Sequence, residues 1–211
     1  MCLLKEEECF SVEEQIFFTA IELFAEFGVE GVSLSDIATA IGIEVKSIYN
    51  YYVSKKELLT SIYRHCVELH RNVEPDLGEL LRMAETAPLH QLLGRLQCRL
   101  PPVDQAIFDK ILLIALHDFS LNFDSAELLR DSLFCPVENI VAPVVSRLIE
   151  LGRVEPLDVP TFIQVFKNYC FATGVLNSSG LKTDQDAKLK GYAMLFSLIK
   201  PAHSDIAAAK L

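Results

Sequence analysis

The stretch from Ser33 to Leu58 constrains the fold more than any other part of the chain, because it holds two short helical patterns separated by a glycine. Ser33 stands three residues before Asp36, a spacing at which a hydroxyl and a carboxylate cap the free N–H groups of a helix start. That helix is expected to end at Gly42, in a left-handed conformation. A second short helix is expected over about 45–52. Two helices joined by a turn of three or four residues that contains Gly predict a helix-turn-helix, whose second helix can enter the major groove of DNA.

Two further capping patterns flank this unit. Ser11 with Glu14 predicts the start of a helix that runs to about Phe27, and Ser54 with Glu57 predicts another that runs to about residue 72. In the first of these helices, one apolar stripe is expected to face the helix-turn-helix; it comprises Ile16, Ala20, Leu23, Phe24 and Phe27.

The residues in this part of the chain resemble the DNA-binding domain of the TetR family of bacterial transcriptional regulators. The match consists of Phe24, Gly28, Gly31, Ser33, Asp36-Ile37-Ala38, Gly42-Ile43, Ile48-Tyr49, Tyr51-Tyr52, Ser54-Lys55 and Glu57-Leu58. It is strong over about 12–60, and beyond that it rests on length and an all-helical pattern. The resemblance implies an all-α chain, with a three-helix DNA-binding domain at 1–54 (1–10 a frayed tail) and a larger helical regulatory domain at 55–211.

The start of the second short helix is expected to meet DNA. The residues predicted to contact it are Ser33, Ser35, Glu44, Val45, Lys46, Ser47, Tyr49, Asn50, Tyr51 and Lys55. Lys46 is a candidate for guanine O6 and N7, Val45 for a thymine methyl group, and Glu44 for cytosine N4. Many members of the family have Ser in place of Glu44 and Gly in place of Lys46, so a base preference cannot be transferred. The alternative is a trihelical unit used only for packing.

The charge of the chain opposes a surface that binds nucleic acid everywhere. The formal net charge is −10, and the first 60 residues hold four lysines, no arginine and eleven acids, which gives 4 − 11 = −7. One interpretation is a small basic patch around Lys46, Lys55 and Lys56, with the acids facing away and an operator complex sensitive to salt. The other is a head that binds DNA poorly, or only as a dimer with very good base contacts.

Further helices are expected at about 76–86, 89–99, 103–121, 125–134, 137–151, 160–178 and 183–198. The helix at 103–121 is apolar nearly all round, which predicts burial. Since regulatory domains of the family enclose a ligand, this helix is the candidate wall of the cavity, through Phe108, Ile111, Leu112 and His117. A satisfied core or surface histidine is the alternative for His117.

The resemblance also implies a homodimer that forms through a late pair of helices. The interface residues predicted on 137–151 and 160–178 are Val141, Val144, Val145, Leu148, Phe162, Phe166 and Tyr169. Pro143 is expected to kink the first of these helices or to mark its true beginning.

Neither enzymatic nor metal chemistry has a clear pattern in the chain. There is no G-x-S-x-G, no glycine-rich phosphate loop and no H-E-x-x-H, and no cofactor is predicted. Cys66, His70 and Glu74 share one helix face, but a lone pair at this spacing is more often incidental, so no metal is predicted. The six cysteines are expected to be free thiols. Without a signal peptide or an apolar run that could span a bilayer, the chain is predicted to be cytoplasmic, with no membrane partner.

Together these observations predict a DNA-binding transcriptional regulator, a repressor that leaves a near-palindromic operator in double-stranded DNA when an apolar or aromatic small molecule binds its C-terminal domain. The main alternative is a TetR-like protein with weakened DNA binding that acts through a protein partner. A third is a small-molecule carrier or enzyme.

Overall fold

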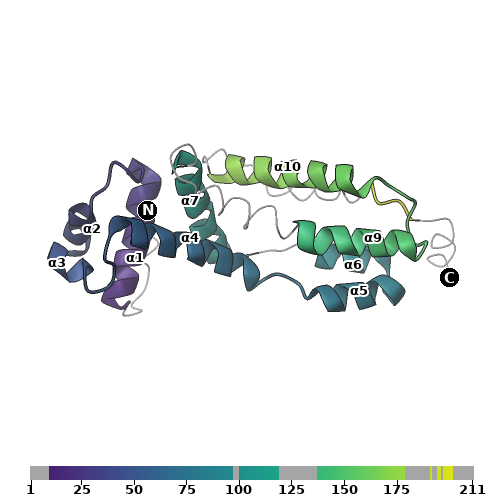
Figure 1. Cartoon of the computed structure of the whole chain (residues 1–211), viewed down its shortest axis with the longest axis horizontal. Coiled ribbons are helices and arrows are strands. Elements are labelled where there is room, and N and C mark those ends of the chain that lie inside the picture. Colours follow the sequence, from purple (N-terminus) through teal and green to yellow (C-terminus); the bar gives the residue numbers. More distant parts are fainter. Residues whose placement is uncertain are drawn as a thin grey trace.

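The computed structural model describes residues 10–96, 100–118, 137–178, 191, 194–195 and 197–201, and it confirms the predicted all-α fold. Within this part of the chain, the one β-type pairing is an isolated bridge between Val154 and Pro201. The helices are α1 (Val12–Phe27), α2 (Leu34–Ile41), α3 (Val45–Ile48), α4 (Lys55–Arg71), α5 (Leu77–Thr86), α6 (Leu89–Arg95), α7 (Pro102–Asp118), the π-helix η2 (Val137–Val141), α9 (Ala142–Glu150) and α10 (Val159–Ser178). They form an elongated molecule with α1–α3 at one end and α5, α6 and α9 towards the other (Figure 1).

The predicted helix starts around the helix-turn-helix are confirmed. Ser11 and Ser33 each form a complete capping box, with Glu14 and Asp36 respectively. At α4 the Ser54 hydroxyl accepts from the Glu57 N–H, but the Glu57 carboxylate accepts from Val53 instead of the cap residue. These contacts are local in sequence, which explains why spacing alone located them.

The connection from α2 to α3 also follows the prediction, except at its far end. Gly42 is left-handed, with φ 73° and ψ 30°, and its N–H donates to the end of α2. The helix predicted over 45–52 was wrong in length, since α3 ends at Ile48. Beyond it, the N–H groups of Asn50 and Tyr51 donate to carbonyls three residues back, so the chain continues as a tighter turn.

A first hydrophobic core joins α1, α2 and α3 to α4 and α7. Ile16 and Phe24 of α1 and Ile37 of α2 are fully buried there, together with Ile111 and Ile114 of α7. Phe27, predicted to belong to the buried stripe of α1, is 58% exposed, because α1 ends at this residue. We call the DNA-binding domain predicted at 1–54 the head. Its core therefore extends beyond the three predicted helices into α4 and α7.

Polar contacts also attach α7 to the head. Lys110 of α7 forms an ion pair with Glu22 of α1. At the end of α7, the Tyr63 hydroxyl of α4 donates to the buried Asp118 carboxylate at 3.2 Å. The ring of His70 stacks on Phe108, with centroids 4.5 Å apart. We therefore describe α1–α4 and α7 as one packing unit.

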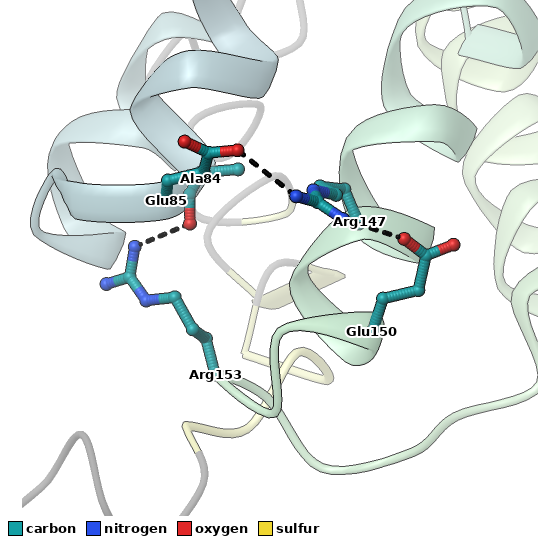
Figure 2. Close-up of polar contacts among 5 residues, drawn as sticks. All are labelled: Ala84, Glu85, Arg147, Glu150 and Arg153. Carbon is teal, nitrogen blue, oxygen red and sulfur yellow. Dashed lines mark hydrogen bonds and ion pairs between the residues drawn. The ribbon is translucent and has the colours of Figure 1, made fainter.

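A second hydrophobic core lies between α5, α6, η2, α9 and the first half of α10. Arg147 of α9 bridges the Glu85 carboxylate of α5, at 3.1 Å, and Glu150 of its own helix, at 3.2 Å (Figure 2). Arg153 donates to the Ala84 carbonyl at the end of α5, at 2.9 Å. These hydrogen bonds fix α5 beside α9, and those to Glu85 and Glu150 raise the pKa of the Arg147 guanidinium.

The segment predicted as one helix over 137–151 consists of two parts. The π-helix η2 covers its first turn, and α9 begins at Ala142 with Pro143 in its first turn. Proline has no N–H to donate and is tolerated at a helix start, so the prediction that Pro143 marks the true beginning is the better of the two.

Helix α10 connects the two cores. Phe162, Ile163 and Phe166 in its first half belong to the second core. The helix also packs against α7, and Figure 1 shows its far end reaching that helix. The helix predicted at 125–134, most of the one at 183–198 and the tail at 1–9 lie outside the described residues. No helix in the described part is long and apolar enough to cross a membrane.

Candidate nucleic-acid interface

The start of α3 presents a row of side chains without a role in the core. Glu44, Val45, Lys46, Tyr49 and Asn50 are exposed, whereas Ser47 is half-buried. Ile48 lies between them and is fully buried, so it anchors the helix while its neighbours face outwards. This outward surface has the polar character that a recognition helix offers to base edges.

Five of the predicted DNA-contacting residues meet in one surface hollow of about 510 Å³. Ser33, Ser35, Val45, Tyr49 and Lys55 line it, together with Glu30, Gly31, Val32, Leu34 and Asp36. Tyr49 is 55% exposed at its edge, and Tyr51, farther along the turn, is 42% exposed. The structure thus brings together side chains from the start of α2, from α3 and from the start of α4.

The start of α2 is already occupied by its own cap. The Ser33 hydroxyl donates to Asp36 Oδ2 at 2.6 Å and accepts from the Asp36 N–H at 3.2 Å. The Ser33 N–H donates to the same carboxylate oxygen, at 2.8 Å. Hydrogen bonds from the Ser33 hydroxyl and N–H lower the pKa of Asp36, so this carboxylate is ionised at neutral pH. A phosphate contact at Ser33 stays a prediction, and it would have to share the hydroxyl with Asp36.

Lys55 has a structural role that its position at a helix start did not reveal. Its ammonium donates to the carbonyls of Val29, at 2.9 Å, and Val32, at 3.0 Å. Both acceptors belong to the connection between α1 and α2, so the side chain ties the start of α4 to that turn. An ammonium has three N–H donors, and one of them is left for a phosphate.

Lys46 is paired with a neighbouring carboxylate. Its Nζ lies 2.5 Å from Glu44 Oε2, and the two side chains are 80% and 70% exposed respectively. Glu44 is the N-cap residue of α3 but makes no side-chain capping bond. Both charged groups therefore lie at the solvent-exposed surface, paired with each other. Residues two positions apart do not face each other on a regular helix, so the sequence pattern did not predict this pair.

The residues predicted to line a ligand cavity are divided between the first core and the surface. Phe108, Ile111 and Leu112 are buried in the core that α7 shares with α1 and α4. His117 is exposed near the end of α7. The apolar pattern correctly indicated a buried helix, but its burial is explained by packing against the head. The role of these residues in ligand binding stays a prediction.

A second surface hollow, of about 530 Å³, was not predicted. It lies between the end of α4 and α6, and its lining comprises Asn72–Asp76, Gly94 and Arg95. The lining is mostly polar, and Arg95 is paired with Glu79 at 3.2 Å. A loop of this kind has no periodic pattern, which is why sequence reasoning missed it.

The side chains predicted for the dimer interface are also packed within the chain. Val141, Val144, Val145, Leu148, Phe162 and Phe166 are buried in the second core, and Tyr169 is half-buried against it. Burial within one chain and burial between two chains demand the same apolar pattern. The outward face of α10 instead carries Gln164, Val165, Asn168, Phe171 and Ala172, all exposed.

The described residues contain no group of three or more His, Cys, Asp or Glu side chains that could hold a metal ion. The candidates on α4 are separated by their surroundings. Cys66 is 1% exposed in the first core, and His70 stacks on Phe108.

Sequence comparison with known proteins matches only the N-terminal part of the chain. Residues 16–62 match the family model described as bacterial regulatory proteins of the tetR family. An uncharacterised helix-turn-helix transcriptional regulator, YezE of Bacillus subtilis, is 38% identical over 53 residues, which are 25% of this chain and 27% of that protein. The negative regulator of the biofilm operon icaADBC, IcaR of Staphylococcus aureus, is 32% identical over 62 residues, 29% of this chain and 33% of that protein. The chain thus spans about a quarter to a third of the curated relatives it matches.

Solved structures share the fold over most of the chain. A transcriptional regulator from Saccharomonospora viridis in complex with choline has a TM-score of 0.66 and 19% identity, over 88% of this chain and 95% of that one. The ketosteroid regulator KstR2 of Mycobacterium tuberculosis has a TM-score of 0.59 and 19% identity, over 92% and 97%. AibR in complex with isovaleryl coenzyme A and operator DNA has a TM-score of 0.58 and 18% identity, over 90% and 98%. The first two are named as transcriptional regulators, and all three share the fold of this chain.

Proposed function

Residues 16–62 carry a TetR-family DNA-binding domain, and on this basis we propose that the protein is a transcriptional regulator that binds double-stranded DNA through α3. The observation that carries the proposal is the arrangement around α3. Its fully buried anchor, Ile48, is surrounded by exposed side chains that have no packing role. Exposed polar side chains at the start of the second helix are what a recognition helix presents to base edges.

Tyr49 supplies the sharpest test of this surface. Its ring is 55% exposed at the edge of the hollow shared with Ser33 and Lys55, where its hydroxyl would donate to a phosphate. Tyr49→Phe removes that donor and should weaken binding to all DNA sequences by about tenfold, the effect of roughly one hydrogen bond in each of two heads. Tyr169→Phe removes the same hydroxyl group from α10, away from α3. The DNA affinity of this control variant should equal that of the wild type.

The assay is a selection of genomic fragments at low salt with the full-length protein, followed by titration of the enriched fragments. A near-palindromic site bound by the wild type, with weaker binding by Tyr49→Phe, supports the proposal. If the folded protein enriches no fragment, operator binding is refuted. The acidic head, with its charge of 4 − 11 = −7 over residues 1–60, would then favour the alternative of a regulator that acts through a protein partner.

We propose that the protein acts as a homodimer, since two heads about 34–36 Å apart would contact successive major-groove turns of a near-palindrome. The predicted interface residues are occupied in the second core, so the outward stripe on α10 is the better candidate surface. Val165 and Phe171 are 43% and 37% exposed on it. Val165→Glu with Phe171→Glu should convert the dimer to a monomer in sedimentation equilibrium. Val103→Glu alters a residue that is 64% exposed on α7, and it should leave the mass unchanged.

We propose that a small molecule releases the protein from its operator and that the protein acts as a repressor. Support comes from the fold shared with regulators crystallised with choline and with isovaleryl coenzyme A, and from the negative regulator IcaR among the sequence relatives. We further propose that the effector is apolar or aromatic, as expected from the apolar helices that follow the DNA-binding domain. The test adds choline and isovaleryl coenzyme A, then a panel of apolar metabolites, to the protein–operator complex. Release by one compound, at a concentration that also raises the thermal midpoint of the free protein, supports this part of the proposal.

A further inference from the structure

Glu44 and Lys46 form one exposed, oppositely charged pair at the outer edge of α3. Their contacting atoms, Oε2 and Nζ, are 2.5 Å apart. Glu44 is the N-cap residue of α3, but no N–H of the helix donates to its side chain. Ile48 of the same helix is fully buried in the first core, so α3 is anchored while the pair faces outwards.

The geometry of this pair matches the major-groove edge of a single G·C base pair. Guanine presents the acceptors O6 and N7, and cytosine presents the donor N4 beside them. Guanine O6 and cytosine N4 are hydrogen-bonded to each other, about 2.9 Å apart, which is close to the spacing of the two side-chain tips. An ammonium and a carboxylate in contact therefore offer the complementary donor and acceptor at the required separation.

An A·T pair fits this arrangement less well. Adenine places an amino donor where guanine has O6, so the Lys46 ammonium loses one acceptor and faces a donor instead. Thymine places the acceptor O4 where the Glu44 carboxylate needs the N4 donor of cytosine, so two acceptors would face each other. Both Glu44 and Lys46 would therefore favour G·C over A·T at the same operator position.

The pairing also explains how a carboxylate can be tolerated at a surface that meets DNA. A lone Glu44 would be repelled by the phosphates, but with Lys46 beside it the pair carries no net charge. Such a pair contributes selectivity and adds little non-specific affinity.

We infer that Glu44 and Lys46 together bind one G·C base pair in each half of the operator, Lys46 through guanine and Glu44 through cytosine N4. This inference rests on the proposed function, because it assigns base specificity to the same surface. It differs from separate contacts by the two residues in one respect: both substitutions must relax the same position of the operator.

The experiment is a site selection from a randomised duplex pool with the full-length protein and its variants Glu44→Ala, Lys46→Ala and the double variant. The charge controls are Glu26→Ala and Lys56→Ala, which alter exposed residues on α1 and α4 by the same charges. Circular dichroism and thermal midpoints check folding; because exposed ion pairs contribute little stability, the Glu44 and Lys46 variants should fold like the wild type.

We expect the wild type to require a G·C pair at one position in each half-site. Each single variant should reduce that preference about tenfold at the same position, and the double variant should reduce it no further than the larger single effect. The charge controls should change affinity without changing the preferred bases. Relaxation at two different positions, or at none, overturns the inference while DNA binding stands. Failure of the folded wild type to enrich any sequence overturns both this inference and the proposed function.

Discussion

Replacement of Lys55 by methionine tests the structural tie between α4 and the α1–α2 connection. Methionine keeps much of the apolar stem but removes both hydrogen bonds to the carbonyls of Val29 and Val32, which are 2.9 and 3.0 Å long. A hydrogen bond that involves a charged group contributes about 1.5–3 kcal/mol. Because the contacts are only partly buried and share one ammonium, we expect a combined loss of about 2 kcal/mol in the free energy of unfolding. For a chain of this size, that loss lowers the thermal midpoint by about 4–8 °C.

The measurement is urea and thermal unfolding of the full-length protein. Lys56→Met is the control, because it removes the same charge from the next residue, which is exposed. A Lys55→Met variant whose free energy of unfolding lies within about 0.5 kcal/mol of this control would refute the structural role.

DNA binding by the same variant measures a separate property of Lys55. If its third N–H donor also meets a phosphate, Lys55→Met weakens binding to all sequences and flattens the dependence of log K on log salt by about 0.9 per head. An unchanged slope with reduced stability would assign Lys55 to the structure of the head alone.

Two further predictions concern local packing and pH. Gly31→Ala should destabilise the protein by about 2–3 kcal/mol, because the added Cβ would lie 2.4 Å from the Phe27 carbonyl oxygen. Gly42→Ala is the control and should cost only about 1 kcal/mol, because Gly42 has a left-handed backbone but open space around it. Equal losses of free energy in urea unfolding would contradict the clash at Gly31. Burial lowers the pKa of His65 below 6.5, so the unfolded chain binds the proton more readily and stability should fall as the pH drops below that value. His65→Gln should flatten the thermal midpoint between about pH 7.5 and 5.5, and an equally steep profile in the variant would exclude His65 as the source.

The head could be predicted closely because its decisive signals are local. A serine three residues before an acid located two complete capping boxes, and Gly42 located the end of α2. The length of α3 could not be predicted this way. Ile48 and Tyr52 are both buried and four residues apart, a spacing that also fits one face of a helix, whereas the N–H groups of Asn50 and Tyr51 form the i to i+3 hydrogen bonds of a tighter turn.

The sequence does not determine what a buried residue packs against, for a physical reason. The apolar faces of α7, η2 and α9 showed correctly that these helices are buried. Periodicity does not say whether the partner is a ligand, a second chain or another helix of the same chain, because all three remove apolar surface from water. Phe108 therefore packs against His70 and the head core, and Val144 packs inside the second core, although the first was expected at a ligand and the second at a dimer interface.

The lysines of the DNA-binding domain have contacts within the protein that bear on how this domain would bind DNA. Of its four lysines, Lys46 is paired with Glu44 and Lys55 is tied to backbone carbonyls, while Lys5 lies outside the described residues. An ammonium that is paired with a carboxylate, as Lys46 is with Glu44, releases few counterions from DNA, so the salt dependence of operator binding should be shallow. Affinity must then depend on neutral donors such as the Tyr49 hydroxyl and on base contacts at α3. A DNA-binding domain with an acidic surface and few unpaired cations would bind random DNA weakly, so it would spend little time bound to DNA other than its operator.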